Sequence, residues 1–519
     1  MTEPTSAREL TSGRVAELTG RVFATSGETL DAVSPLTGKP LGQVPVSTTG
    51  DVAEAFSRAR AAQAEWAQVP VAERADLLLR VHDLVLDRQR DLLDLVQWES
   101  GKARKHAFEE LADVANTARY YARVAPQHLL PTRRAGMFPF LTRATELRHP
   151  KGVVGVIAPW NYPFTLAISD ALPALVAGNA VVTKPASLTA LCALAAAELV
   201  ADAGLPPDLW QVVVGAGSSI GNALIDHSDF VCFTGSTQTG RSVAARCGER
   251  LIGATMELGG KNAMLVLDDA DLDVAAEGAV RGCFSNAGQL CISIERLYVA
   301  AAVYDRFVER LVARVEAMRV GPGLDFGPDM GSLISADQLC TVTAHVEDAR
   351  DKGARVLTGG VARPDLGPYF FAPTVLAEVT PDMTCFAEET FGPVVSVYPV
   401  ADEDEAVARA NDTAFGLNAA VYGRDVRRAG AVGERLHVGT VNVNEAYAAA
   451  WGSVDAPMGG VGDSGMGRRH GAEGLLKYTE AQTIAVQRVP MTPPAATSYD
   501  AFARGLTLAL RAMRKGGHK

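Results

Sequence analysis

Hydrophobic and polar positions follow two different periods along the chain. Between residues 51 and 100, apolar side chains recur at the spacing of a helix face, and Pro70 and Gly101 interrupt the pattern, so we expect two helices there. From residue 152 onward, short valine-rich runs alternate with helical stretches. Repeated strand–helix alternation with short connections is typical of a parallel sheet covered by helices on both faces.

This alternation occurs in two regions. In the first we expect strands at 152–158, 180–184, 211–214 and 230–233 and helices at 189–203, 218–225 and 237–248. In the second we expect strands at 263–267 and 295–300 and helices at 271–285 and 303–318. The pattern predicts an α/β protein whose two domains meet near residue 260, and a length of 519 residues also exceeds what one hydrophobic core usually organises.

The tail beyond residue 493 has a different character. In an expected helix, one side carries the apolar residues Phe502, Leu506, Leu510 and Met513. The basic residues Arg504, Arg511, Arg514 and Lys515 lie elsewhere on that helix. We expect this amphipathic helix to pack on the protein's own oligomer; a membrane-surface helix is the alternative.

Composition and charge argue against several classes of protein. The chain is 48% apolar and 21% charged, as soluble globular proteins are. A net charge of −11 without a basic stripe argues against a nucleic-acid partner. The first residues lack the apolar core of a signal peptide, and no window is long and apolar enough for a transmembrane segment, so we expect a cytoplasmic protein. Seven scattered cysteines fit a reducing compartment, and no ligand spacing suggests a metal.

One cysteine stands in unusual surroundings. Cys291 closes the run Phe284-Ser-Asn-Ala-Gly-Gln-Leu-Cys291, among small and amide-bearing residues. Free cysteines are mostly buried and inert, and no neighbouring histidine is present in the sequence to activate this one. By itself Cys291 is interpreted as a buried thiol, with a nucleophile as the alternative.

Two other residues each have a structural and a catalytic interpretation. Asn161, held between Pro159 and Pro163, would cap the following helix or offer its amide to an oxyanion. Glu257 would pair with Lys261 or, in an apolar cleft, have its pKa raised towards neutrality, as a general base requires.

Two glycine loops lie between an expected strand and an expected helix. Gly215-Ala-Gly-Ser-Ser-Ile-Gly221 has its third glycine one residue late for the dinucleotide motif G-x-G-x-x-G. In Phe233-Thr-Gly-Ser-Thr237, free backbone N–H groups and the helix dipole would favour a pyrophosphate. Neither loop identifies a cofactor by itself.

Taken together, the motifs resemble those of the aldehyde dehydrogenase superfamily. They are, in the family's order, Pro159-Trp-Asn-Tyr-Pro163, Lys184-Pro-Ala-Ser187, Phe233-Thr-Gly-Ser-Thr237, Glu257-Leu-Gly-Gly-Lys261, Gly288-Gln-Leu-Cys291, Glu389-Thr-Phe-Gly-Pro393 and Pro457-Met-Gly-Gly460. Several motifs in the right order are far more specific than any one of them. The resemblance implies the oxidation of an aldehyde to its carboxylic acid with NADP or NAD.

The resemblance also implies a role for each candidate residue. Cys291 resembles the nucleophile that forms a thiohemiacetal and then a thioester. Asn161, with the Cys291 backbone N–H, resembles the oxyanion hole, and Glu257 resembles the base that activates water. The implied cofactor-binding residues are Trp160, Lys184, Ser187, Gly235, Ser236, Glu389 and Phe391. In this family the dinucleotide site does not rely on G-x-G-x-x-G, which accounts for the near miss in the first glycine loop.

Two of these residues bear on the choice of cofactor. Many NAD-preferring relatives have a glutamate at the position of Ser187, and such a carboxylate would repel a 2'-phosphate. A serine beside Lys184 removes the repulsion and adds a donor. The resemblance therefore implies that NADP is used well, with NAD as the alternative.

The substrate follows less directly from the sequence. The chain resembles bacterial enzymes of the succinate-semialdehyde dehydrogenase group, so we expect oxidation of succinate semialdehyde; a broad-specificity aliphatic or aromatic aldehyde dehydrogenase is the alternative. That group clamps the substrate carboxylate with arginines, but none occurs at 164–170 or 283–286, where Ser285 takes one of the positions. Ser453 and Arg296 are possible substitutes, although Arg296 is expected to be structural. The aromatic residues that suit a semi-apolar substrate channel are Trp160, Tyr162, Tyr447 and Trp451.

The sequence argues against two other functions within the family. A coenzyme A-acylating enzyme would pass the thioester to a thiol instead of water, and the presence of Glu257 argues against it. An inactive binding member would be expected to have lost Cys291, Asn161 or Glu257, and none is lost.

The family architecture implies a division of the chain. We expect a Rossmann-type dinucleotide-binding domain at 1–140 with 156–257 and a catalytic domain at 258–452. We expect a small β oligomerisation arm at 141–155 with 478–492 and a C-terminal extension at 493–519. Residues 142–149 and 483–488 alternate enough to serve as strands of the arm. The resemblance implies a homodimer or a homotetramer joined partly through that arm.

Overall fold

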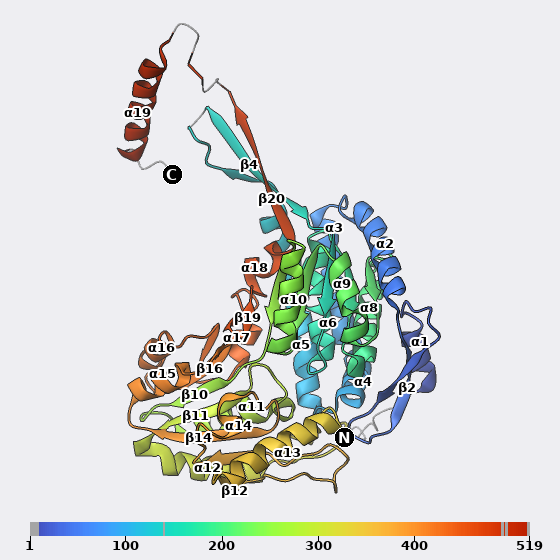
Figure 1. Cartoon of the computed structure of the whole chain (residues 1–519), viewed down its shortest axis with the longest axis vertical. Helices are drawn as coiled ribbons and strands as arrows, with labels where there is room; N and C mark the ends of the chain where they lie inside the picture. The colour runs from blue at the N-terminus through green and yellow to red at the C-terminus, as the bar shows by residue number, and fades with distance from the viewer. Residues whose placement is uncertain (1–9, 139–140, 489–491, 494–496, 516–519) are drawn as a thin grey trace.

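The computed structural model describes residues 10–138, 141–488, 492–493 and 497–515. Two α/β lobes form the body, and an arm of strands projects from it (Figure 1). Each lobe is organised around its own large hydrophobic cluster. The predicted α/β fold with two sheet-containing parts is confirmed.

A six-stranded sheet of order β19-β9-β8-β5-β6-β7 organises the first lobe. Its strands are β5 (Val153–Ile157), β6 (Ala180–Lys184), β7 (Trp210–Val212), β8 (Phe230–Thr234), β9 (Gly253–Glu257) and β19 (Gly465–Met466). Neighbouring strands are parallel except β19, which runs antiparallel to β9. The valine-rich runs are buried because helices pack on this sheet, whereas β19 adds its edge from near the end of the chain.

Helices surround the first sheet (Figure 1). They include α2 (Thr49–Trp66), α3 (Val71–Asp87), α4 (Gln89–Ser100), α5 (Arg104–Leu129), α6 (Pro163–Ile168), α7 (Ala171–Val176), α8 (Ala190–Asp202), α9 (Asn222–His227) and α10 (Thr237–Glu249). The single helix expected between Pro70 and Gly101 is wrong, because Arg88 leaves helical geometry at φ −95° and ψ 13° and its guanidinium pairs with Asp202 at 2.6 Å.

A seven-stranded sheet of order β12-β13-β14-β11-β10-β16-β17 organises the second lobe. Its strands are β10 (Asn262–Val266), β11 (Ile294–Ala300), β12 (Arg355–Thr358), β13 (Thr374–Ala377), β14 (Val394–Val400), β16 (Asn418–Tyr422) and β17 (Thr440–Val443). Its main helices are α11 (Leu272–Phe284), α12 (Tyr304–Glu316), α13 (Ala336–Asp351), α15 (Glu403–Asn411) and α16 (Val426–Gly433). Residues 258–261 alone connect β9 of the first sheet to β10 of the second, so Glu257 lies at the junction of the lobes.

Shorter elements complete the lobes. They are α1 (Ser12–Thr19), β1 (Thr29–Val33), β2 (Pro40–Pro45), α14 (Thr384–Ala387), β15 (Phe415–Gly416), α17 (Ala448–Gly452), β18 (Val461–Gly462) and α18 (Gly471–Leu476).

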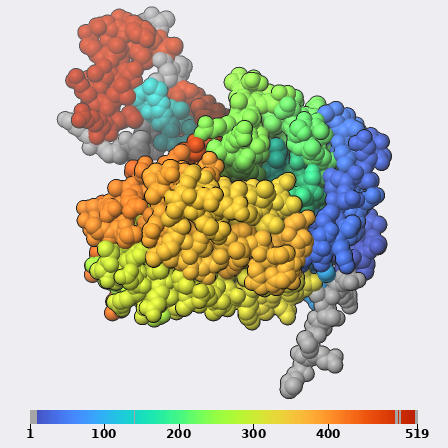
Figure 2. Space-filling view, turned by 60° about the horizontal axis from the view of Figure 1, so that its bottom comes forward, coloured from blue at the N-terminus to red at the C-terminus, as the bar shows by residue number. Residues whose placement is uncertain are grey.

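The projecting arm is a three-stranded antiparallel sheet. Strand β4 (Thr142–Pro150) pairs along its length with β20 (Thr479–Gln487) and also with β3 (Thr132–Arg134), while residues 153–155 belong to β5 of the first lobe. Figure 2 shows helix α19 (Tyr499–Lys515) with the arm, apart from both lobes. Across the described ranges, no helix has the length and apolar character needed to cross a membrane.

Candidate active site

Cys291 follows a tight turn between α11 and β11. Asn286, Ala287 and Gly288 all have positive φ, at 51°, 54° and 72°. A Cβ on Gly288 would lie 2.0 Å from the carbonyl oxygen of Gly392, so glycine is required there. We call residues 285–291 the cysteine turn. It presents Cys291 to a small apolar cluster that draws on both lobes.

Amide side chains fasten the cysteine turn to the surrounding backbone. Asn262 Nδ2 donates to the carbonyl oxygen of Cys291 at 2.8 Å. Gln289 Nε2 donates to the carbonyl oxygen of Asn286 at 3.0 Å, and its Oε1 accepts from the backbone N–H of Ile334 at 2.9 Å. Because these partners come from separate segments, the turn cannot shift without breaking several hydrogen bonds.

Asn161 reaches the cysteine turn from the other lobe. It lies between β5 and α6, and its Nδ2 donates to the carbonyl oxygen of Gln289 at 3.1 Å. The helix-cap interpretation is wrong, since α6 begins after Tyr162 and has no side-chain cap bond. An amide nitrogen carries two hydrogens, so the second remains for an oxygen bound at the cysteine turn.

Glu257 ends β9 with a buried carboxylate. Its Oε1 has no hydrogen-bond partner within the part of the chain that the structure describes. The expected pairing with Lys261 is wrong, because that ammonium pairs with Glu295. Burial raises the pKa of Glu257 to about 7, although the nearby Arg469 opposes the shift. A carboxylate that is half ionised near neutral pH and lacks an internal donor is suited to accept a proton.

The thiol of Cys291 is not ionised by its surroundings. Burial raises the pKa of Cys291 to about 12, and the carboxylates of Glu389 and Glu257 add to the shift. Arg469 opposes it and is itself held by Asp170 at 2.8 Å. The thiol is therefore neutral at pH 7, and a base has to take its proton before the sulfur can attack a carbonyl.

The second glycine loop leads from β8 into α10. Ser236 caps the helix by accepting from the backbone N–H of Thr239, and the Gly235 N–H donates to the carbonyl oxygen of Glu257 at 3.0 Å. A Cβ on Gly235 would lie 2.7 Å from the ring of Phe233. The loop thus places the first turn of a 13-residue helix beside the strand that carries Glu257, an arrangement that suits a phosphate group.

Three more of the predicted cofactor residues gather where the lobes meet. Phe391 stands edge-on to Trp160, with ring centroids 5.4 Å apart and an angle of 89°. The Gly260 N–H donates to Glu389 at 2.9 Å. A Cβ on Gly259 would lie 2.1 Å from the same carboxylate, so the glycines let Glu389 approach the connection after β9. Burial, together with the charge of a neighbouring carboxylate, raises the pKa of Glu389 to about 8.

Lys184 and Ser187 lie at the carboxyl end of β6. Lys184 is buried, and burial lowers its pKa to about 8. Its Nζ donates to the carbonyl oxygen of Pro185 at 3.1 Å, and no carboxylate pairs with it among the described residues. Ser187 Oγ donates to the carbonyl oxygen of Gly215 at 3.4 Å, so the first glycine loop begins beside the predicted cofactor serine.

A cavity of about 310 Å³ lies next to the cysteine turn. Its walls are mostly aromatic and apolar, with three charged side chains among them: Glu109, Ala112, Asp113, Asn116, Tyr162, Arg281, Leu290, Tyr447, Ala448, Trp451 and Gly452. The expected aromatic residues Tyr162, Tyr447 and Trp451 are thus brought together. Leu290, the neighbour of Cys291, connects the cavity to the nucleophile position.

Arg281 is the cavity residue that the sequence analysis missed. Its guanidinium lies 3.5 Å from Glu109 and 3.3 Å from Glu445, and 5.2 Å from the ring centroid of Tyr447. Ser285 donates to the carbonyl oxygen of Arg281 at 2.7 Å, one helical turn away. The signal was helical spacing, since a residue four positions before Ser285 lies on the same face of α11.

The two substitutes considered from the sequence do not line this cavity in the described structure. Arg296 donates to the carbonyl oxygens of Lys261 at 2.8 Å and Ala410 at 3.0 Å, so its expected structural role is confirmed. Ser453 Oγ donates to the carbonyl oxygen of Ala449 at 2.7 Å. The anion partner offered by the cavity is therefore Arg281.

Comparison with known proteins agrees with this geometry. A family model described as the aldehyde dehydrogenase family matches residues 22–484. The chain is 54% identical over 480 residues to a protein of Mycolicibacterium smegmatis named putative succinate-semialdehyde dehydrogenase [NADP(+)], covering 92% of this chain and 93% of that one.

Two further relatives extend the comparison. A 3-sulfolactaldehyde dehydrogenase of Pseudomonas putida is 38% identical, with 90% of this chain and 95% of the relative covered. The crystal structure of an NADP-dependent enzyme of E. coli superposes with a TM-score of 0.86 at 37% identity, covering 90% of this chain and 96% of that one.

Proposed function

We propose that this chain, which belongs to the aldehyde dehydrogenase family and is an NAD(P)-dependent oxidoreductase acting on aldehydes, oxidises succinate semialdehyde to succinate. The observation that carries the proposal is Arg281, the one basic side chain among the described residues of the aldehyde cavity. A guanidinium binds a carboxylate through paired, charge-assisted hydrogen bonds. The name of the M. smegmatis relative supports the same substrate, and the name of the P. putida relative specifies an aldehyde with a sulfo group.

The proposed reaction begins with transfer of the Cys291 proton to Glu257. The sulfur then attacks the aldehyde carbonyl, and the oxyanion of the resulting thiohemiacetal accepts hydrogen bonds from Asn161 Nδ2 and the Cys291 backbone N–H. A bound nicotinamide supplies the acceptor for the hydride that leaves this carbon. Glu257 then releases its proton to solvent, and the restored carboxylate accepts a proton from the water that attacks the thioester on Cys291. The C–S bond breaks, the acid leaves, and the Cys291 thiolate takes the proton back from Glu257.

The residues present fit a dinucleotide. The first turn of α10, with Ser236, would hold the pyrophosphate, while Glu389 would hold the nicotinamide ribose, with Trp160 and Phe391 beside the ring. Lys184 and Ser187 place a cation and a hydroxyl, without a carboxylate, at the end of β6. We therefore propose that NADP is used at least as well as NAD.

We also propose how the chain is organised. Residues 1–140 with 156–257 would bind the dinucleotide together with 153–155 of β5, 258–452 would carry the nucleophile, and strands β4 and β20 of the arm would join copies of the chain into a homodimer or a homotetramer. The exposed pattern of β20 after Thr479 supports such a contact. All seven cysteines are free, which suits the cytoplasm.

A broad-specificity aliphatic or aromatic aldehyde dehydrogenase is the second candidate. The rings of Tyr162, Tyr447 and Trp451 in the cavity wall favour it, because they would contact any apolar aldehyde.

A single assay separates the two candidates. The purified chain is tested with each cofactor on succinate semialdehyde, on butanal as the neutral aldehyde of equal length, and on benzaldehyde. We expect kcat/KM for succinate semialdehyde to exceed that for butanal by about tenfold or more. Equal values would overturn the substrate and leave the second candidate standing, whereas no activity on any aldehyde would overturn the reaction itself.

A further inference from the structure

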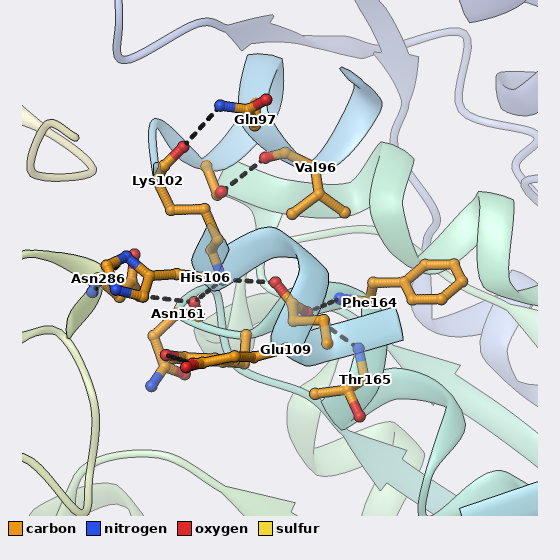
Figure 3. A network of polar contacts seen from close by, with 12 residues as sticks. Val96, Gln97, Lys102, His106, Glu109, Asn161, Phe164, Thr165 and Asn286 are labelled. Atoms are coloured by element: carbon orange, nitrogen blue, oxygen red, sulfur yellow. Dashed lines mark hydrogen bonds and ion pairs between the residues drawn. The ribbon is translucent and has the colours of Figure 1, made fainter. Parts of the chain in front are cut away.

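A fully buried ion pair contacts the segment that carries Asn161, and Figure 3 shows one of its members, Lys102, with Asn161. Lys102, between α4 and α5, and Glu110, in α5, pair with each other, and both side chains are 0% exposed. Neither belongs to the described lining of the aldehyde cavity. The pair is therefore not part of the machinery proposed above.

Each partner of the pair also reaches the segment between β5 and α6. Lys102 Nζ donates to the carbonyl oxygen of Asn161 at 2.7 Å and lies 3.9 Å from the ring centroid of Tyr162. Glu110 Oε2 accepts from the backbone N–H groups of Phe164 at 2.8 Å and Thr165 at 3.0 Å. Opposite charges thus hold both ends of residues 161–165.

The same carbonyl group is connected to the cysteine turn. Asn286 Nδ2 donates to the carbonyl oxygen of Asn161 at 2.9 Å and to that of Gln289 at 3.1 Å. The side chain of Asn161 donates to the same Gln289 carbonyl. A closed network therefore runs from Lys102 through Asn161 to the turn that ends at Cys291.

Stability alone does not account for such a pair. Two charges buried together lose their hydration, and a well-packed apolar pair of similar volume is often equally stable or more so. What an apolar pair could not do is donate to one carbonyl and accept from two N–H groups at fixed positions. A displacement of about 1 Å at a catalytic group can slow a reaction by about a hundredfold.

We propose that Lys102 and Glu110 are a positioning pair that holds the Asn161 amide where the thiohemiacetal oxygen forms. The inference rests on the proposed function, because it takes Asn161 as the oxyanion donor. Neither residue touches the aldehyde or the cofactor, so both act through Asn161.

The test is a double-mutant cycle measured by single-turnover hydride transfer. Asn161→Ala should slow this step by about a hundredfold to a thousandfold. Lys102→Met should slow it by about tenfold to a hundredfold, with KM for the aldehyde changing less than about threefold. The combination Lys102→Met/Asn161→Ala should be no slower than Asn161→Ala, because the pair acts only through that amide.

Two further variants separate positioning from folding. Lys102→Met/Glu110→Met removes both buried charges together and should fold with a Tm near that of the wild type while remaining slow. The matched control is Arg104→Met, which breaks the nearby pair of Arg104 with Asp94 and should slow hydride transfer less than about threefold. If Lys102→Met does not fold, the doubly apolar variant replaces it in the cycle.

The outcomes are distinct. Additive effects of the Lys102 and Asn161 changes, or a folded Lys102→Met/Glu110→Met variant with the wild-type rate, would overturn the positioning role and leave the proposed function intact. If Asn161→Ala itself keeps the wild-type rate, the oxyanion role is wrong and this inference falls with it.

Discussion

The cysteine turn and the aldehyde cavity adjoin each other but are built on different principles. In the turn, the side chains of Asn262 and Gln289 are bonded to backbone groups from separate segments. In the cavity wall, Arg281, Glu109 and Tyr447 contact each other through their side chains, and Arg281 also pairs with Glu445. Backbone-anchored geometry fixes the position of the reacting atoms. In the function proposed above, a few paired side chains of the cavity wall would select the substrate.

The largest effect is expected at the turn. Cys291→Ala removes the proposed nucleophile and should lower turnover by about a thousandfold or more for every aldehyde. Steady-state nicotinamide reduction measures this. Cys340→Ala, an exposed thiol, is the control and should keep the wild-type rate. Substantial turnover by Cys291→Ala would contradict the mechanism for all substrates at once.

The next largest effect is expected at Glu257, the proposed base beside the cysteine turn. With a pKa of about 7, Glu257 is protonated in acid and cannot accept a proton, so kcat should rise as the pH rises through about 7. Glu257→Gln should lower turnover by about a hundredfold and abolish that pH dependence. A pH profile of kcat measures both. An unchanged inflection in the variant would assign the titration to another group.

The cavity should respond selectively. Arg281→Gln should raise KM for succinate semialdehyde by about tenfold to a hundredfold and change butanal oxidation less than about threefold, because only the former carries a carboxylate. Arg119→Gln is the matched control, an arginine that bonds Asn116 of the cavity but does not line it. Equal losses on both aldehydes would show that Arg281 supports the fold rather than the choice of substrate.

A substitution of Glu109 should have a smaller effect on KM, in the opposite direction to Arg281→Gln. Its carboxylate competes with the substrate for Arg281, and burial raises its pKa. Glu109→Gln keeps an acceptor for the tyrosine hydroxyls but removes the charge, so KM for succinate semialdehyde should fall about threefold. A rise in KM would mean that Glu109 is needed to orient Arg281.

The cofactor site should respond in its choice between NADP and NAD and not in its choice of aldehyde. Ser187→Glu places a carboxylate at the end of β6 and should lower kcat/KM with NADP by about tenfold, while leaving that with NAD unchanged or improved. Ser187→Ala is the control, since it removes the hydroxyl without adding charge. Equal losses with both cofactors would contradict a 2'-phosphate contact.

Sequence reasoning was most successful where the signal is local. The apolar runs of β5, β6 and β8 and the order of the motifs around Asn161, Glu257 and Cys291 could be recognised along the chain. The helix break at Arg88 could not, because the apolar spacing continues across it and no proline or glycine marks the residue that leaves helical geometry.

The polar contacts in the cavity wall were harder to predict from the sequence. Arg281 is one helical turn from Ser285, but its contact with Glu109 joins α11 to a residue of α5 that is far away in the sequence. The Lys102 pair is further removed, since a lysine in a loop gives no sign that it reaches the carbonyl group of residue 161. Polar contacts between distant segments follow from the tertiary fold, and no period along the chain encodes them.

The placement of β19 has a consequence for the order in which the protein matures on the ribosome. The first sheet receives its edge strand, and Asp170 its partner Arg469, from residues made after the whole second sheet. A nascent chain that already contains Cys291 and Asn161 therefore still lacks the arginine whose charge most opposes the rise in the pKa of Glu257. The surroundings that set this pKa are complete only after the segment that follows the second sheet has been made and has returned to the first sheet.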